Sequence, residues 1–304
     1  MLPLPYMWQM RVERLKKMFG GMFGQGERRP QLCPACGTLV GVTATRCHQC
    51  GANLRFGLAA WSKGLSEFFG GHAPATTGIL ILNVILFVAE VFGTMHSGKG
   101  GGFLLGVDGE TLYRLGACFG PSIFAGHEWY RLITAMFLHG GLLHIGFNMM
   151  VLIDIGPMVE EVYGSARYLF LYVTMGAASF LVSAWAGNFS VGASGAILGL
   201  IGLLIAITTK RGGTQMRELR SRLISWVVTI FLLGFLAGGL VRTDHWAHLG
   251  GLVAGFLLGK VFADRLPEPG QERTKAYALG WIAGLALIAS FGLMMLHYSN
   301  PIPG

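Results

Sequence analysis

The feature that most constrains this sequence is a series of long apolar segments. A helix needs roughly 17 to 25 residues to cross about 30 Å of hydrocarbon, and seven windows of that kind occur. They fall at about 77–95, 141–160, 166–186, 193–209, 222–241, 245–263 and 276–296. Only 12% of the 304 residues are charged, against about 25% in ordinary soluble proteins. The sequence therefore predicts an all-α polytopic membrane protein and excludes a water-soluble globule.

The distribution of basic residues predicts the orientation of these spans. The chain carries a net charge of +8, and its Lys and Arg residues gather in segments 1–75, 210–222 and 264–275. The positive-inside rule places such segments in the cytoplasm. We therefore expect a cytoplasmic N terminus and an outer C terminus. We expect no removable signal peptide and no nucleic-acid partner, because beside a membrane this charge sets orientation.

Four of the five cysteines form two pairs near the N terminus. Cys33 and Cys36 make the first Cys-x-x-Cys pair, and Cys47 and Cys50 make the second. Four thiolates bind a tetrahedral zinc ion, and the Gly after each pair permits a turn that directs amides toward sulfur. We predict a zinc-ribbon-like head that is held together by a structural zinc ion. We expect this head to bind a cytoplasmic protein partner. His48 as a competing ligand and iron as the metal remain alternatives.

Polar side chains occur inside three of the spans. His144 and Asn148 lie on the second, Ser194 begins the fourth, and His248 lies near the start of the sixth. Polar groups at membrane depth are costly and mark function. All three spans run inward, so at 1.5 Å per residue these groups share one depth below the outer surface. The spacing of four between His144 and Asn148 puts both on one helix face.

These groups suit hydrolysis. The Ser194 hydroxyl becomes a nucleophile when a neighbouring imidazole accepts its proton, and His248 is the candidate base. The amide of Ser194, the side chain of Asn148 and a ring N–H of His144 are candidate donors to the oxyanion. Asp244 lies four residues before His248 and is a candidate contact for the imidazole.

Glycine repeats favour contact between the fourth and sixth spans. Gly195 and Gly199 repeat at four residues, as do Gly251, Gly255 and Gly259. Small residues at this spacing let two helix backbones approach closely in lipid. The repeats therefore predict that Ser194 and His248 lie near one another. Packing of these glycines against other helices is the alternative.

Five short motifs occur in the order found in one protein family. They are Glu128-Trp129-Tyr130-Arg131, Phe137-Leu138-His139, His144-Ile145-Gly146-Phe147-Asn148, Gly192-Ala193-Ser194-Gly195 and Ala247-His248-Leu249-Gly250-Gly251. The chain thus resembles the rhomboid intramembrane serine proteases over roughly residues 77–265.

The resemblance implies a rhomboid-like six-helix bundle, to which the last span adds a seventh helix. It also implies that Ser194 is the nucleophile and His248 the base of a dyad without a carboxylate, with His144 and Asn148 in the oxyanion region and no cofactor for catalysis. In one respect the chain departs from some family members, since Leu198 stands where they carry an aromatic residue that stacks on the imidazole.

The organisation we predict has five parts. They are a basic segment at 1–30, the head at 31–55, a linker at 56–76, the six-span core at 77–265, and a connector with the seventh span and an outer tail at 266–304. The function expected is that of a serine endopeptidase cutting transmembrane segments of proteins near the outer face of a bacterial inner membrane. The alternatives are an inactive rhomboid-like scaffold that binds membrane clients, and a transporter, which the scarcity of intramembrane carboxylates disfavours.

Overall fold

The computed structural model describes residues 31–32, 38–41, 44–49, 73–97, 106–236, 243–268 and 271–299. The predicted basic segment 1–30, most of the linker 56–76, and Cys33, Cys36 and Cys50 lie outside them. The chain divides into two compact units, Met1–Pro74 and Ala75–Gly304. In the first unit, β1 (Gln31–Leu32) pairs antiparallel with β2 (Leu39–Val40).

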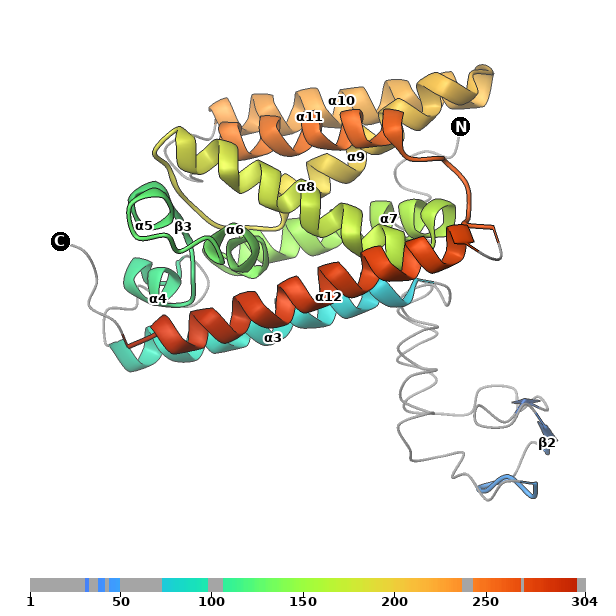
Figure 1. Cartoon of the computed structure of the whole chain (residues 1–304), viewed down its shortest axis with the longest axis horizontal. Helices are drawn as coiled ribbons and strands as arrows, with labels where there is room; N and C mark the ends of the chain where they lie inside the picture. Colours follow the sequence, from blue (N-terminus) through green and yellow to red (C-terminus); the bar gives the residue numbers. More distant parts are fainter. Residues whose placement is uncertain are drawn as a thin grey trace. The chain divides into compact units, whose positions relative to one another are not determined.

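The second unit is a bundle of long helices, which confirms the all-α class (Figure 1). The helices are α3 (Pro74–Ser97), α7 (Leu142–Tyr163), α8 (Ser165–Trp185), α9 (Ser194–Arg211), α10 (Thr214–Leu236), α11 (His245–Val261) and α12 (Gln271–His297). Each matches one predicted span. Six have the length and hydropathy to cross a membrane. The exception, α11, has 17 residues, or about 26 Å at 1.5 Å per residue, the short end of what can cross.

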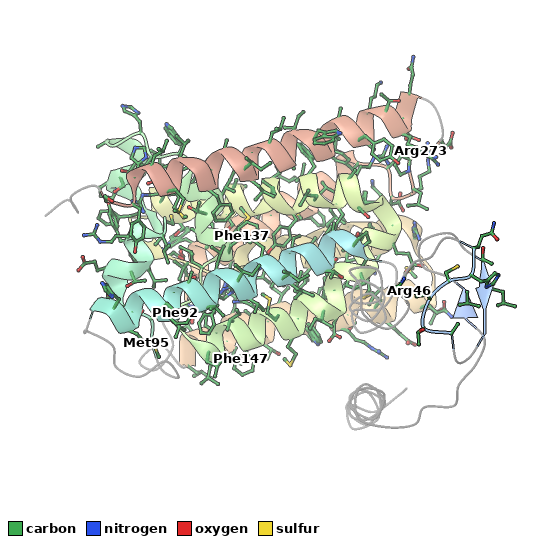
Figure 2. The ribbon with its side chains drawn as sticks, turned by 90° about the horizontal axis from the view of Figure 1, so that it is seen from below. Arg46, Phe92, Met95, Phe137, Phe147 and Arg273 are labelled. Carbon is green, nitrogen blue, oxygen red and sulfur yellow. The ribbon has the colours of Figure 1, made fainter. Side chains whose placement is uncertain are left out.

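The outer surface of the bundle carries apolar side chains, as expected for contact with lipid. Phe92 of α3 and Phe147 of α7 are 67% and 64% exposed, whereas Phe137 is fully buried (Figure 2). In water such exposed aromatic rings would be unfavourable. The exposed apolar surface and the helix lengths together indicate an integral membrane protein.

Between α3 and α7 the chain forms short elements where the sequence predicted only a loop. These are α4 (Gly109–Arg114), β3 (Cys118–Phe119), α5 (Gly120–Phe124), α6 (Arg131–Thr134) and a 3-10 turn at Ala135–Phe137. The β3 strand pairs with β4 (Phe189–Ser190), which precedes α9. The segment before α9 is thereby joined to the loop between α3 and α7.

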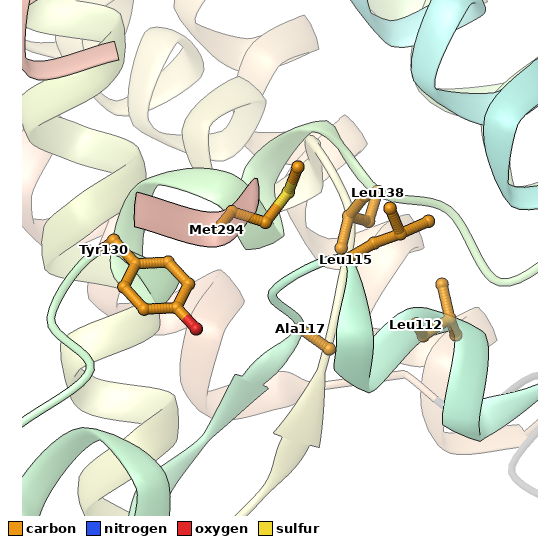
Figure 3. Close-up of a cluster of buried hydrophobic side chains, with 6 residues drawn as sticks. All are labelled: Leu112, Leu115, Ala117, Tyr130, Leu138 and Met294. Carbon is orange, nitrogen blue, oxygen red and sulfur yellow. The ribbon is translucent and has the colours of Figure 1, made fainter. Parts of the chain in front are cut away.

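The C-terminal end of α12 packs against the loop between α3 and α7. Met294 of α12 lies in a buried apolar cluster, shown in Figure 3, with five residues of the loop region. They are Leu112, Leu115, Ala117, Tyr130 and Leu138. The Arg114 guanidinium also donates to the Tyr298 carbonyl at 3.0 Å. The last long helix therefore supports the loop between α3 and α7.

The helices α9 and α11 touch through their backbones. A Cβ atom added at Gly251 would overlap the carbonyl of Gly195, and one added at Gly255 would overlap the carbonyl of Gly199. The close approach predicted from the glycine repeats is confirmed. No side chain separates these two helices at the contact, so the distance between them is set by backbone atoms.

Polar contacts at the other end of the bundle join elements far apart in the chain. The buried carboxylate of Glu160 on α7 accepts from the amides of Ala75 and Thr76 at 2.9 and 2.8 Å and from the Thr76 hydroxyl at 2.7 Å. It thereby satisfies amides that begin α3 and lack helical partners. After α11, Asp264 accepts from the Arg211 guanidinium of α9 at 2.7 Å.

Candidate active site

The serine and histidine predicted to act together meet at one end of the bundle. Ser194 is the first residue of α9, and His248 lies in the first turn of α11. The Nε2 atom of His248 is 2.8 Å from the Oγ atom of Ser194, a normal hydrogen-bond distance. His248 is 4% exposed. The two side chains are thus within proton-transfer reach, although 54 residues separate them in the chain.

In the part of the chain that the structure describes, the Asp244 carboxylate accepts no hydrogen bond from the ring of His248. It is the N-cap of α11, where its Oδ1 atom accepts from the Ala247 amide at 3.0 Å. The same carboxylate accepts from the Asn188 side chain at 3.0 Å and from the Ser183 hydroxyl. The Nδ1 atom of His248 is buried and has no hydrogen-bond partner among the described residues. Asp244 therefore caps the start of α11, and no carboxylate of the described structure is hydrogen-bonded to the His248 ring.

Two further nitrogen atoms point toward the segment that precedes Ser194. A Cβ atom at Gly192 would lie 2.7 Å from Nε2 of His144 and 3.7 Å from Nδ2 of Asn148. Gly192 has a φ of +128°, a conformation open to glycine. The Nδ2 atom of Asn148 is buried without a hydrogen-bond partner in the described structure. Glycine thus leaves space beside two nitrogen atoms that converge near the serine.

A backbone hydrogen bond decides which nitrogen of His144 carries the proton. The Gly140 amide donates to Nδ1 of His144 at 3.3 Å, so in the neutral ring Nδ1 is the acceptor. The hydrogen therefore lies on Nε2, the nitrogen that faces Gly192. His144 is in this way prepared as a donor.

Arg131 is buried within the loop between α3 and α7. It is 2% exposed, donates to the carbonyls of Tyr113 and Ala117 at 2.7 and 3.0 Å, and pairs with Glu128. Its guanidinium lies 4.1 Å from the centre of the Tyr113 ring. These contacts join three segments of the loop between α3 and α7 from inside the protein.

The remaining cysteine, Cys118, lies in an environment that suppresses its reactivity. Cys118 of β3 is completely buried, and burial raises the pKa of its thiol to about 12. The reactive form of cysteine is the thiolate. Cys118 therefore stays protonated at neutral pH and acts as a small apolar residue.

Sequence reasoning missed an aromatic residue beside His248. The ring of Phe231 on α10 lies edge-to-face with His248, with centroids 5.9 Å apart and planes at 82°. Phe231 also stacks on His245 at 5.7 Å. Leu198 is buried in the bundle. An aromatic contact to the imidazole thus comes from a different helix, and no signal in the α10 sequence distinguishes Phe231 from lipid-facing residues.

Comparison with known proteins places this arrangement in a family. Residues 126–265 match the family described as Rhomboid domain. The chain is 34% identical over 214 residues to RHOMBOID-like protein 6, mitochondrial, of Arabidopsis thaliana, which covers 63% of this chain and 68% of the relative. The chain belongs to the rhomboid family.

Other rhomboid relatives are named as proteases. Rhomboid protease GluP of Bacillus subtilis is 36% identical over 204 residues, covering 64% of this chain and 38% of the relative. Rhomboid-like protease 3 of Toxoplasma gondii is 32% identical over 197 residues, which cover 62% of this chain and 73% of the relative. Rhomboid-type serine protease 2 of Emericella nidulans is 36% identical over 152 residues, which cover 48% of this chain and 29% of the relative. At the level of the rhomboid family, these matches confirm the prediction of a serine protease.

Proposed function

We propose that this chain is an intramembrane serine endopeptidase with Ser194 as nucleophile and His248 as general base. The observation that carries the proposal is the 2.8 Å contact between Oγ of Ser194 and Nε2 of His248. As Oγ attacks the scissile carbonyl carbon, Nε2 accepts the hydroxyl proton and then gives it to the leaving amine. Water then hydrolyses the acyl-enzyme by the same route. The mechanism uses no cofactor.

The oxyanion of the tetrahedral intermediate is bound in this proposal by three donors. They are the amide of Ser194 at the start of α9, Nε2–H of His144 and Nδ2 of Asn148. Burial of a hydrogen-bond donor without an acceptor, such as Nδ2 of Asn148, destabilises the folded protein until an acceptor binds there. An oxyanion is the acceptor that would form during the reaction. Donors placed before the charge develops are worth about 3 to 4 kcal/mol each in comparable sites.

The substrates we propose are transmembrane segments of other proteins within the lipid bilayer. A regular helix holds each carbonyl in an internal hydrogen bond, so the substrate must unwind locally before Ser194 can attack. Helix-breaking small residues near the scissile bond should therefore favour cleavage.

The proposed orientation puts the dyad near the outer face. Ser194 begins α9, and the same helix ends at Lys210 and Arg211, about 25 Å away at 1.5 Å per residue. Basic residues favour the cytoplasmic side. The N terminus is then cytoplasmic and the C terminus outside, as in a bacterial inner-membrane protein. Protease access to terminal tags in vesicles of known sidedness tests this orientation.

We also propose that the N-terminal unit is a zinc-ribbon-like head with Cys33, Cys36, Cys47 and Cys50 as ligands. In its described part, Cys47 is buried and its sulfur accepts from the Gln49 amide at 3.4 Å. No group of three or more ligand-type side chains occurs among the residues described, which include only this one of the four cysteines. Zinc content and X-ray absorption of the full chain test the site, with Cys47→Ser as the variant. A cytoplasmic partner of the head would be sought by crosslinking in cells.

The protease proposal is tested with purified protein in detergent, a fluorophosphonate probe and a model transmembrane substrate. We expect labelling and cleavage in the wild type. We expect Ser194→Ala to abolish both activities and His248→Ala to reduce both steeply, with brief chelation having no effect. Ser290→Ala, which removes a hydroxyl from α12, is the control and should remain active. A folded wild type that neither labels nor cleaves varied substrates would contradict the proposal and favour the client-binding scaffold.

A further inference from the structure

We propose that Glu90 of α3 is a positioning residue for the oxyanion region, acting on His144 through the turn that precedes α7. The inference rests on the proposed protease function. It concerns a buried acidic side chain on the first span, which the mechanism above does not use.

Glu90 is completely buried, and its carboxyl group is directed at one backbone amide. Its Oε1 and Oε2 atoms lie 3.0 and 3.1 Å from the amide nitrogen of His139, which donates to them. Glu90 and His139 are 49 residues apart in the chain. The first span is therefore tied to the turn before α7 by this contact.

Gly140, the residue after His139 in this turn, is hydrogen-bonded to the His144 ring. The Gly140 amide donates to Nδ1 of His144 at 3.3 Å, and the Gly140 carbonyl accepts from the Val107 amide at 2.9 Å. The amides of two consecutive residues in the turn thus have different partners. The His139 amide donates to Glu90, and the Gly140 amide donates to His144 and so selects its tautomer. If the His139 amide lost its hydrogen bond to Glu90, the turn could rotate, and the Gly140 amide would then no longer point at Nδ1 of His144.

The ring of His139 adds a second link to the same residue. It is fully buried and packs edge-to-face on His144, with ring centroids 5.2 Å apart. Neither ring nitrogen of His139 has a hydrogen-bond partner in the described structure, so the ring acts on His144 by packing. Fixing the His139 backbone therefore restrains both the position and the tautomer of His144.

The carboxyl group of Glu90 performs this task as a neutral acid. It forms no ion pair with any other described residue, and one amide donor does not compensate a buried negative charge. A neutral carboxyl still accepts the His139 N–H. Glutamine has the same shape and an equivalent acceptor, so Glu90→Gln should preserve the function, whereas Glu90→Leu keeps the side-chain volume but removes the acceptor.

The test measures kcat and KM of the full-length protein on a model transmembrane substrate, together with thermal unfolding. We expect Glu90→Leu to lower kcat about 10- to 100-fold, since a misplaced oxyanion donor costs up to about 10²–10³, with KM unchanged. Glu90→Gln should retain wild-type kcat. Asn83→Leu is the matched control, because Asn83 is buried on the same helix and, among the described residues, its side-chain amide donates only to the Ile79 carbonyl of that helix. It should leave kcat unchanged.

A spectroscopic readout separates positioning from stability. The ¹⁵N shifts of ring-labelled His144 should report one tautomer, with hydrogen on Nε2, in the wild type and in Glu90→Gln, and a mixture in Glu90→Leu. If Glu90→Leu does not fold, Glu90→Asp withdraws the carboxyl by one methylene and should lower kcat in the same direction. Wild-type kcat in the folded Leu or Asp variant, or equal losses in Gln and Leu, would overturn the role of Glu90. An inert wild type would instead refute the protease proposal.

Discussion

Replacing Gly255 by alanine tests whether backbone contact between α9 and α11 sets the geometry of the dyad. Gly255 lies two turns after His248, and its added Cβ would overlap the Gly199 carbonyl oxygen. Because the obstacle is backbone, no side chain can rotate away. To restore an ordinary contact of at least about 3.4 Å, the helices must separate by roughly 1.5 Å at this point.

We take about half of that separation to reach the start of α11. The distance between Oγ of Ser194 and Nε2 of His248 would then increase from 2.8 Å to about 3.5 Å, which is longer than a normal hydrogen bond. A misplacement of about 1 Å costs up to about 10²-fold in rate. Overpacking of this kind costs about 1–3 kcal/mol of stability. We therefore expect Gly255→Ala to lose about 10- to 100-fold in kcat while the protein still folds.

The assay is cleavage of one transmembrane substrate by purified protein, with tryptophan fluorescence to follow thermal unfolding. Gly146→Ala is the control, because Gly146 lies on α7 two residues after His144 and its Cβ would meet nothing within 4 Å. The control should match the wild type. If Gly255→Ala also matches the wild type in kcat and melting temperature, the glycine contact does not set the dyad distance and the reasoning is refuted.

Three other substitutions have defined outcomes. Glu160→Ala removes the acceptor of three hydrogen bonds and should cost about 2–4 kcal/mol in thermal unfolding, while the exposed neighbour Glu161→Ala should not; equal melting temperatures would contradict this. Phe231→Leu removes the ring edge from the proposed base and should lower kcat about 2- to 10-fold, from the worth of such a ring contact; an unchanged kcat would exclude orientation by Phe231. The hydrogen bond from Arg211 holds the pKa of Asp264 below its usual value, so its small stabilisation exists above the ordinary aspartate pKa and is lost as pH falls through the depressed one. The melting curves of wild type and Asp264→Asn should differ slightly at neutral pH and converge on acidification; a gap that widens in acid would contradict this.

Much of the fold could be predicted because its signals are local. The bilayer requires long apolar helices, and each span appears as one uninterrupted window. The glycine repeats on the fourth and sixth spans predicted their contact, because spacing of four places glycines on one helix face. The short elements of the outer loop were missed, since pieces such as Arg131–Thr134 are too brief for a periodic pattern and depend on buried contacts made by Arg131.

The candidate site was predicted in part. Ser194, His248, His144 and Asn148 were found because polar residues in apolar spans stand out. Glu90 carried the same signal in the first window, but its partner is a backbone amide, which leaves no mark in the sequence. Phe231 carried no signal, because an aromatic residue on a lipid-exposed helix is ordinary.

The sequence by itself determined where the seven long apolar helices of the described residues lie, which residues could react, and which side of the membrane each loop is expected to face. These properties depend on the transfer of individual side chains between water and lipid, so they follow from composition along the chain. Only the tertiary structure decided that Asp244 caps α11, that α12 packs on the loop between α3 and α7, that the ring of Phe231 contacts His248, and that Glu90 accepts from the His139 amide. Those contacts depend on which helix faces meet in space, and helix rotation and spacing are set by all the packed side chains together.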